Sequence, residues 1–263
     1  MSRIAETFTR LRTERRLGLI AYLTVGYPGL DLTPELVRTA ADVGADLVEL
    51  GIPFSDPLAD GRTIQASSQA ALKQGVTVKS SLESARQARA LTEVPILFMT
   101  YLNPILSFGL ERFCGAAKEA GVDGLIVPDL PPAEAGELRR HARACDLELV
   151  FFVAPTTSEL GIRTACEAAT AFVYCIAVTG VTGARAELDP AVLPLIERVR
   201  RHTGLPVVVG FGISRAEHLA ALEGHADAAI IASALLDAIG QAPNDAGAQI
   251  RRFLGPLRRV GRA

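Results

Sequence analysis

The sequence predicts an α/β protein, a single (β/α)8 TIM barrel with one extra helix at its N-terminus. Three observations favour this fold. Eight short apolar runs recur along 263 residues, helix-start and helix-end residues lie between them, and no change in composition divides the chain. Barrels of this class commonly have ~250 residues. We therefore expect residues 1–263 to form one domain, with an open doubly wound sheet and a second domain as the alternative.

The eight apolar runs are the predicted strands. They lack the alternation of apolar and polar residues that marks a half-exposed strand, and such runs are typical of strands buried on both faces of a parallel sheet. They cover residues 19–23, 47–50, 96–99, 124–127, 149–153, 172–176, 207–210 and 228–231.

The segments between the runs carry the signals of helix ends. Thr33 followed by Pro34 predicts an N-cap and a proline at the first helical position, and Gly44 predicts the end of that helix. The spacing of a capping box, Ser or Thr followed three residues later by Glu, occurs at Ser80–Glu83, Thr156–Glu159 and Ser214–Glu217.

The first sixteen residues precede the first predicted strand. Ile4, Phe8 and Leu11 recur there at helical spacing. Residues 1–16 are therefore predicted to form a helix that caps the floor of the barrel, the end at which the strands begin.

Composition and charge exclude several classes of function. A net charge of −2 gives no electrostatic reason to expect nucleic acid or an anionic membrane as a partner. No apolar run approaches the ~20 residues that span a bilayer, and the N-terminus lacks the apolar core of a signal peptide. We expect a cytoplasmic protein. Its scattered cysteines, without a CxxC pair, predict reduced thiols rather than a metal site: Cys114, Cys145, Cys166 and Cys175.

Two connections from a strand to the following helix are unusually long, residues 51–62 and about 178–188. Active sites of this fold lie on such connections, at the C-terminal ends of the strands. Long loops there more often bind or cover a ligand than act as spacers.

Glu49 interrupts the second predicted strand near its C-terminal end. A carboxyl group in a buried strand loses hydration, which raises its pKa towards that of an acid usable at neutral pH. The alternative is a buried glutamate paired with an arginine, but no neighbouring strand contains an arginine or a lysine. Glu49 is therefore the candidate acid.

The loop after Glu49 supplies two more carboxylates. Asp56 precedes Pro57 and Asp60 precedes Gly61, and each aspartate has an alternative interpretation as a turn residue. The functional interpretation is that this loop places Asp60 over the mouth of the barrel.

Glycine-rich turns follow the last predicted strands. Residues 178–183 and 210–214 follow the sixth and seventh, and Ala232 and Ser233 follow the eighth before a short helical stretch. Glycines let backbone N–H groups approach an anion, and a helix N-terminus adds a favourable dipole. Because loops after strands seven and eight form the usual phosphate site of barrels, a phosphorylated substrate is predicted.

Two common barrel chemistries lack their residues. A Schiff-base enzyme needs a lysine at the mouth, but Lys73, Lys79 and Lys118 do not follow strand ends. A metal-dependent aldolase, isomerase or epimerase needs converging histidines. The four histidines lie in predicted helices or floor-side connections: His141, His202, His218 and His225. With these two mechanisms excluded, the sequence favours acid–base catalysis by carboxylates on a phosphorylated substrate.

These motifs resemble the α subunit of tryptophan synthase along nearly the whole chain. The segment ELGIPFSDPLADG, residues 49–61, is close to diagnostic for that family. The other matching segments are MTYLNP (99–104), FVYC (172–175), VTGVTGA (178–184) and GFGI (210–213).

The resemblance implies a lyase of tryptophan biosynthesis that reversibly cleaves indole-3-glycerol phosphate to indole and glyceraldehyde 3-phosphate. Glu49 would protonate indole C3 and then, as a carboxylate, help to remove the proton of the side-chain hydroxyl. Asp60 would accept the indole N–H and stabilise the positive charge on the ring.

The same resemblance implies the substrate contacts. The residues that would hold the phosphate are Gly183, Phe211, Gly212, Ala232 and Ser233. Tyr22, Met99 and Tyr174 would line the indole pocket or support Glu49, although Tyr22 and Met99 also have a plain core interpretation. Thr182 would close over the substrate and bond to Asp60.

The resemblance further implies a β-subunit partner in an αββα heterotetramer, with interface positions at Asp56, Pro57, Asn103 and Asp129. The β subunit would carry pyridoxal phosphate, so this chain should need no cofactor and no metal.

Three residues depart from the family pattern. Ala232 replaces a usual glycine beside the phosphate, Tyr27 stands where aspartate is common, and Arg62 replaces a proline and could bias Asp60 towards its ionised form. Two alternatives therefore stay open: a stand-alone lyase that releases free indole, and a catalytically silent subunit that only activates a partner. The silent subunit would have lost Glu49 or Asp60.

Overall fold

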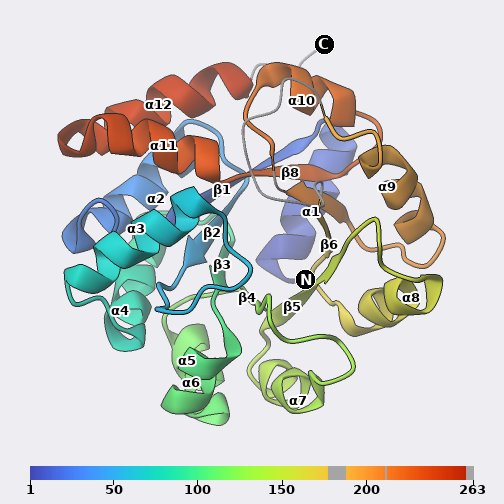
Figure 1. Cartoon of the computed structure of the whole chain (residues 1–263), viewed down its shortest axis with the longest axis horizontal. Coiled ribbons are helices and arrows are strands. Elements are labelled where there is room, and N and C mark those ends of the chain that lie inside the picture. Colours follow the sequence, from blue (N-terminus) through green and yellow to red (C-terminus); the bar gives the residue numbers. More distant parts are fainter. Residues whose placement is uncertain (177–187, 211, 259–263) are drawn as a thin grey trace.

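The computed structural model describes residues 1–176, 188–210 and 212–258. Its strands pair in parallel, each with the next along the chain and β8 with β1, and so close a barrel that the helices surround (Figure 1). The strands are β1 (Gly18–Thr24), β2 (Leu47–Gly51), β3 (Ile96–Met99), β4 (Gly124–Ile126), β5 (Glu148–Val153), β6 (Val173–Ile176), β7 (Val207–Gly210) and β8 (Ala228–Ile231). The predicted (β/α)8 fold is confirmed, and every predicted strand is present.

The helices follow the predicted alternation. They are α1 (Arg3–Glu14), α2 (Thr33–Asp42), α3 (Arg62–Lys73), α4 (Val78–Arg89), α5 (Leu102–Phe108), α6 (Leu110–Glu119), α7 (Gly136–Ala144), α8 (Glu159–Ala168), α9 (Val192–Arg200), α10 (Ala216–Leu222), α11 (Ser233–Gln241) and α12 (Ala246–Leu257), with 3-10 turns η1 (Leu30–Leu32) and η2 (Pro243–Asp245). Within the described ranges, no helix is both long and apolar enough to cross a membrane.

Each strand divides its apolar side chains between two cores. Alternate residues such as Ile20, Leu97 and Val208 fill the barrel interior. The residues between them, such as Ala21 and Phe98, pack outwards against the helices. Because both faces are covered, the strands contain the uninterrupted apolar runs seen in the sequence.

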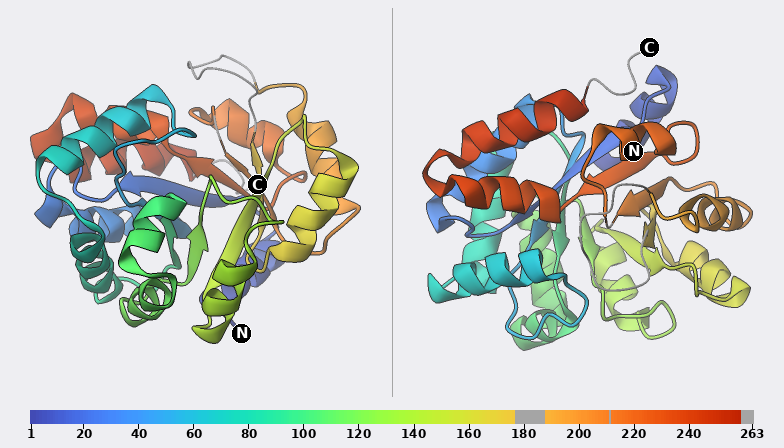
Figure 2. Two further views of the ribbon diagram at one scale, coloured as in Figure 1. Left: turned by 60° about the horizontal axis from the view of Figure 1, so that its bottom comes forward. Right: turned by 45° about the horizontal axis from the view of Figure 1, so that its top comes forward.

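Helix α1 closes the floor of the barrel, as predicted (Figure 2). Its apolar residues Ile4, Phe8 and Leu11 are buried in the same core as the barrel interior. The ring of Phe8 meets that of Phe172 edge-on, with 5.9 Å between centroids.

Salt bridges fasten α1 to the floor. Three arginines of α1 each pair with an aspartate that directly precedes an even-numbered strand. The pairs are Arg3–Asp123, Arg10–Asp46 and Arg12–Asp227. The same aspartates accept backbone N–H groups at the start of the preceding strand, from Ile96, Leu19 and Val207 respectively. At the fourth equivalent place a neutral residue, Thr170, accepts the N–H of Leu149 at 2.8 Å. Four side chains at the floor thus accept a backbone N–H at the start of a strand, and three of them are charged. We call these residues the floor staples: Asp46, Asp123, Thr170 and Asp227.

The predicted helix caps are mostly wrong. Thr33 is the first residue of α2 rather than its N-cap, and its hydroxyl accepts the N–H of Gly26 at 2.9 Å. The capping boxes are wrong at Ser80–Glu83, Thr156–Glu159 and Ser214–Glu217. Thr77 and Ser80 form the box of α4, Ser158 caps α8, and α10 has no side-chain cap. Several residues with a hydroxyl group precede α4 and α8. The N-cap is the residue whose backbone is extended, and the spacing of residues in the sequence does not reveal which one that is.

Candidate active site

A cavity of about 180 Å³ lies at the C-terminal ends of the strands, at the opposite end from α1. Inward-facing strand residues form its deep wall: Tyr22, Glu49, Met99, Tyr174 and Ile230. Its outer wall comes from the starts of α3 and α11 and from the turn after β7: residues 61–64, 212–214, 232–234 and 237. Because none of the described lining residues is a lysine or a histidine, a lysine Schiff base and a histidine-ligated metal have no residues in this part of the cavity.

Glu49 lies in the middle of β2, in register with Tyr22 of β1 and Leu97 of β3. Its side chain faces the cavity, and only 1% of the residue is exposed. Its Oε2 atom has no hydrogen-bond partner among the described residues. Burial, and secondarily the charge of Asp60, raises the pKa of Glu49 to about 8. Glu49 therefore holds a proton at neutral pH, and no described arginine or lysine pairs with it.

Asp60 lies in the loop between β2 and α3, beside the hydroxyl of Tyr101. Burial raises the pKa of Asp60 to about 6, while a hydrogen bond from Tyr101 lowers it in part. The expectation that Arg62 biases Asp60 towards its ionised form stays a prediction. Asp60 itself does not line the cavity, but the next two residues do.

The two carboxyl groups differ in protonation state near neutral pH. With pKa values of about 8 and about 6, Glu49 keeps its proton while Asp60 has largely lost its own. The negative charge of Asp60 also helps to keep the proton on Glu49. A proton donor close to a fixed negative charge in a buried site is an arrangement suited to general acid catalysis.

The walls beside Glu49 are aromatic and apolar. Tyr22, Met99 and Tyr174 all line the cavity, as the resemblance implies. The ring of Tyr174 packs on that of Phe152, with 4.6 Å between centroids. Burial raises the pKa of both tyrosine hydroxyls well above the usual value, so they stay neutral. The walls can therefore hold a flat apolar ring beside Glu49.

The opposite wall is suited to an anion. Gly212, in the turn after β7, has a φ of 77°, a conformation that glycine adopts easily. Ala232 is the N-cap of α11 and Ser233 its first residue, so free backbone N–H groups of α11 lie at this wall. The structure thus brings Gly212, Ala232 and Ser233 together. Three further predicted residues, Thr182, Gly183 and Phe211, lie outside the described residues.

The predicted interface residues lie on three adjacent connections. Asp56 and Pro57 follow β2, Asn103 lies at the start of α5 after β3, and Asp129 follows β4. Asp56, Asn103 and Asp129 are exposed, and Pro57 is half-buried. Asp129 accepts the N–H of Leu102 at 2.9 Å, which joins two of the connections. The carboxylate of Asp56 bonds to the Ser55 hydroxyl rather than to a turn N–H.

Sequence reasoning missed Tyr101, although it lies in a motif that the resemblance used. Its hydroxyl accepts the N–H of Ala59 at 2.9 Å and bonds to Asp60, and its ring packs on Phe54. The available signal was its spacing, since Tyr101 follows the cavity residue Met99 by two positions. Thr63 and Asp237 were also missed; they join α3 to α11 by a 3.1 Å hydrogen bond.

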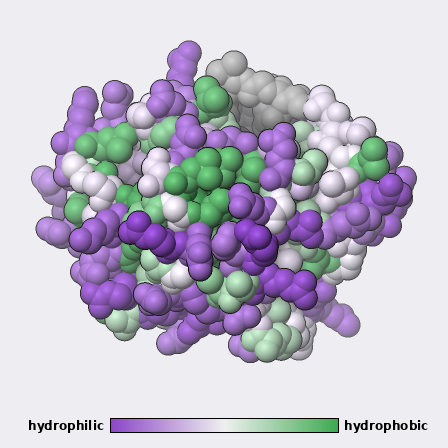
Figure 3. Space-filling view, turned by 90° about the horizontal axis from the view of Figure 1, so that it is seen from below, coloured by the Kyte–Doolittle hydropathy of each residue, from purple (hydrophilic) through white to green (hydrophobic). Residues whose placement is uncertain are grey.

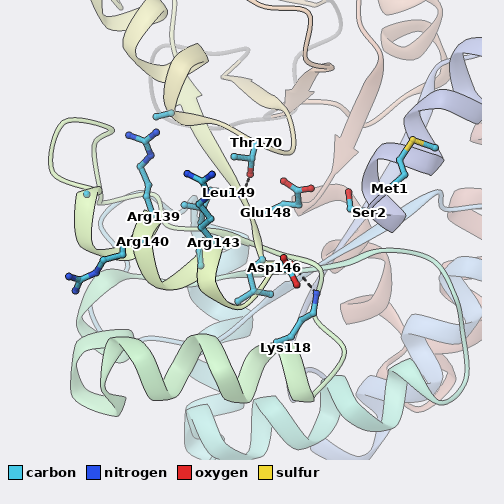
Figure 4. Close-up of a pocket in the computed structure, with 14 residues that line it drawn as sticks. Met1, Ser2, Lys118, Arg139, Arg140, Arg143, Asp146, Glu148, Leu149 and Thr170 are labelled. Atoms are coloured by element: carbon cyan, nitrogen blue, oxygen red, sulfur yellow. Dashed lines mark hydrogen bonds between the residues drawn. The ribbon is translucent and has the colours of Figure 1, made fainter.

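A larger hollow of about 910 Å³ lies elsewhere, beside α6, α7 and the start of β5 (Figure 4). It borders Thr170, the floor staple that is not an aspartate. Half of its charged residues are exposed arginines of α7, Arg139, Arg140 and Arg143. It lies at the floor rather than at the end where barrels bind ligands. Among the described residues, no cluster of histidine, cysteine, aspartate or glutamate could hold a metal ion, and all four cysteines are free.

Comparison with known proteins gives a consistent result. A family model described as "Tryptophan synthase alpha chain" matches residues 8–259. A tryptophan synthase alpha chain from Roseiflexus sp. (strain RS-1) is 51% identical over 244 residues, which is 92% of this chain and 94% of that one. The alpha chain from Chloroflexus aurantiacus is 48% identical over 98% of this chain and all of its own.

Solved structures agree in fold. A chain of Mycobacterium tuberculosis tryptophan synthase superposes with a TM-score of 0.92 at 33% identity, covering 100% of this chain and 99% of its own. Tryptophan synthase subunit alpha from Legionella pneumophila superposes with a TM-score of 0.91 at 33% identity, covering 99% and 98%.

Proposed function

The chain belongs to the tryptophan synthase alpha chain family, a family of carbon–carbon lyases of tryptophan biosynthesis, and we propose that Glu49 and Asp60 carry its reaction. The proposed reaction is the cleavage of indole-3-glycerol phosphate to indole and glyceraldehyde 3-phosphate. One observation carries the assignment: a protonated carboxyl group, whose Oε2 atom has no hydrogen-bond partner among the described residues, faces the cavity beside a second carboxyl group that is ionised.

Glu49 supplies the proton that makes indole a leaving group. Its carboxylic acid gives a proton to C3 of the ring, and the positive charge moves to the ring nitrogen. The bond from C3 to the first glycerol carbon then breaks, and its electrons restore the aromatic ring. The hydroxyl on that carbon loses its proton to the Glu49 carboxylate and becomes the aldehyde. Glu49 ends in its starting state, and no electrons are gained or lost overall.

Asp60 stabilises the charge that forms in between. An ionised carboxylate that accepts the indole N–H favours the protonated ring most when the ring is fully charged, which lowers the barrier rather than only tightening substrate binding. The hydrogen bond from Tyr101 supports the ionised form of Asp60, because it lowers the pKa of that carboxyl group.

The remaining walls position the substrate. The indole ring would lie against Tyr22, Met99 and Tyr174, and the phosphate against Gly212, Ser233 and the N-terminus of α11. These steps are proton transfers and the cleavage of one carbon–carbon bond, with no electrons gained or lost overall, so the proposal assigns no cofactor to this chain.

A β subunit is the proposed partner, in an αββα assembly in the cytoplasm, with pyridoxal phosphate on the β subunit. The connections after β2, β3 and β4 would form the contact. They carry Asp56, Asn103 and Asp129, and Leu58 is 92% exposed there. The side of the molecule that carries α5 to α7 shows an apolar area on a mainly hydrophilic surface (Figure 3).

Release of indole by the purified chain tests the proposal. Glu49→Gln keeps the shape of the side chain but cannot give up a proton, so turnover should fall by ~10²-fold or more while the variant folds and binds substrate. The matched control is Glu148→Gln, at the floor end of β5, which should keep full turnover. Near-normal turnover of Glu49→Gln would refute its role.

The same assay separates the alternatives on partnership. Turnover that rises strongly when a β subunit is added supports the assembly. High turnover of the chain alone, unchanged by the β subunit, would instead identify a stand-alone lyase. Absence of turnover with and without the partner would identify a silent subunit.

A further inference from the structure

Arg62 stands at the mouth of the active-site cavity. It is the first residue of α3, directly after the N-cap Gly61, and its side chain is exposed and lines the cavity. Among the described residues, no carboxylate forms a salt bridge with Arg62 and no group bonds to its guanidinium. Within the described ranges, the charge at this position is therefore unpaired.

The described cavity wall contains two carboxyl groups besides Arg62. They belong to Glu49, which is protonated and neutral, and to Asp237 in the first turns of α11. Arg62 is the only cation among the lining residues that the structure describes. A phosphate monoester carries a charge of about −1.5 to −2 at neutral pH, so Asp237 would repel it unless a cation lies nearby.

The fold holds Arg62 next to the anion-binding wall. Helices α3 and α11 lie side by side (Figure 1), and Thr63 donates a hydrogen bond to Asp237 at 3.1 Å. Arg62 directly precedes Thr63. Ser233, where α11 begins, lies four residues before Asp237. Two helix N-termini and one guanidinium thus border the same space, and all three favour an anion.

We infer that Arg62 binds the phosphate of the substrate and so determines specificity for the phosphorylated form. This inference rests on the proposed function and deepens it. Arginine offers two parallel N–H donors that match phosphate oxygens, and such charge-assisted bonds are strong.

The test combines a binding measurement with kinetics. Titration calorimetry with inorganic phosphate gives the Kd of the anion, and indole release gives KM and kcat for indole-3-glycerol phosphate. In Arg62→Ala we expect the Kd for phosphate and the KM each to rise about tenfold, with kcat changed less than about twofold, because the phosphate does not take part in bond breaking. Added salt should weaken phosphate binding more in the wild type than in Arg62→Ala.

Three further variants sharpen the result. Arg62→Lys keeps the charge and should recover much of the loss. Arg62→Pro removes the charge but suits the first helical position, so it should match Arg62→Ala without harming the fold. Arg252→Ala removes an equal charge from an exposed position of α12 and should change nothing.

The inference is overturned if Arg62→Ala and Arg62→Pro leave Kd and KM within about twofold of the wild type while Glu49→Gln still abolishes cleavage. If the wild type binds phosphate through Arg62 but does not cleave the substrate, the proposed function fails and the phosphate contact stands.

Discussion

The ring of Tyr22 on β1 lies over Gly51 on β2, so closely that a Cβ atom on Gly51 would come within 2.0 Å of the tyrosine hydroxyl oxygen. Across the barrel the same relationship recurs, since a Cβ on Gly210 of β7 would lie 2.1 Å from the hydroxyl of Tyr174 on β6. In each pair the tyrosine leans along its strand and covers a glycine two register positions further on. Glycine at the strand end thus makes room for each aromatic wall of the cavity.

Gly51→Ala should therefore damage activity more than stability. The added methyl group must push the buried Tyr22 ring, and the nearest open space is the cavity beside Glu49. We expect turnover of indole-3-glycerol phosphate to fall at least tenfold, with a stability loss of about 1–3 kcal/mol. Steady-state kinetics and urea unfolding check both values.

The matched control is Gly115→Ala in α6, where a Cβ would meet no atom within 4 Å. That substitution should stabilise the protein by about 0.5–1 kcal/mol, because alanine favours a helix, and should leave turnover unchanged. Equal behaviour of the two variants would contradict the argument from Tyr22.

The fold could be predicted from the sequence because burial on both faces leaves a strong local signal. All eight strands were found from short apolar runs, and α1 from the helical spacing of its apolar residues. The floor staples were not, because Asp46, Asp123 and Asp227 lie far apart in sequence and only the closed barrel brings each to the start of a neighbouring strand. The helix caps failed because adjacent hydroxyl residues compete for the same role.

The candidate site was only partly predictable for a similar reason. Glu49 was identifiable because a carboxylate in an apolar strand is conspicuous. The ionised state of Asp60, by contrast, depends on burial and on Tyr101, forty-one positions further along the chain. The position of Arg62 at the cavity mouth likewise follows from the packing of α3 beside α11, which no local pattern shows.

The pH dependence of catalysis should be bell-shaped. Activity requires Glu49 protonated, so it should be lost as pH rises through about 8. It requires Asp60 ionised, so it should be lost as pH falls through about 6. The profile of kcat/KM reports these groups in the free enzyme. The phosphate of the substrate also titrates near pH ~6, so the pH profile of Asp60→Asn is measured as well. An acid limb of kcat that persists unchanged in Asp60→Asn would argue against Asp60 as the group that must be ionised.

Stability should depend on pH through Glu49 as well. The pKa of Glu49 is about 8 in the folded chain against a usual 4.5. Between these two pH values the folded state keeps a proton that the unfolded state has lost. Stability from this group is complete below pH 4.5 and declines as pH rises to about 8. Glu49→Gln should therefore gain stability over the wild type across that range, by roughly 2–4 kcal/mol at its upper end. Parallel Tm curves for the two proteins would disprove the buried, protonated state.

Tyr101→Phe should shift one limb of the pH profile. The lost hydroxyl lowered the pKa of Asp60 and accepted the N–H of Ala59. Without it, the pKa of Asp60 should rise, the acid limb should move to higher pH, and kcat at neutral pH should fall several-fold. The basic limb, which belongs to Glu49, is the internal control and should stay in place. A uniform loss of activity at every pH would indicate a merely structural role for Tyr101.

Asp46→Asn should weaken the fold and spare the chemistry, because Asp46 lies at the floor end of the barrel. The carboxylate is buried, accepts two hydrogen bonds from Arg16 at 2.6 and 2.7 Å, and accepts the N–H of Leu19 at 3.0 Å. Asparagine can still accept from Leu19, but it removes the buried charge that pairs with Arg16 and leaves Glu14 as the remaining carboxylate beside that arginine, so we expect a loss of about 2–4 kcal/mol in urea unfolding. The control, Glu35→Gln, weakens an exposed pair with Arg38 on α2 and should cost less than about 1 kcal/mol. Turnover of the folded Asp46→Asn protein should match the wild type. A large fall in kcat would mean that the floor staples and the catalytic end are coupled, contrary to the separation argued here.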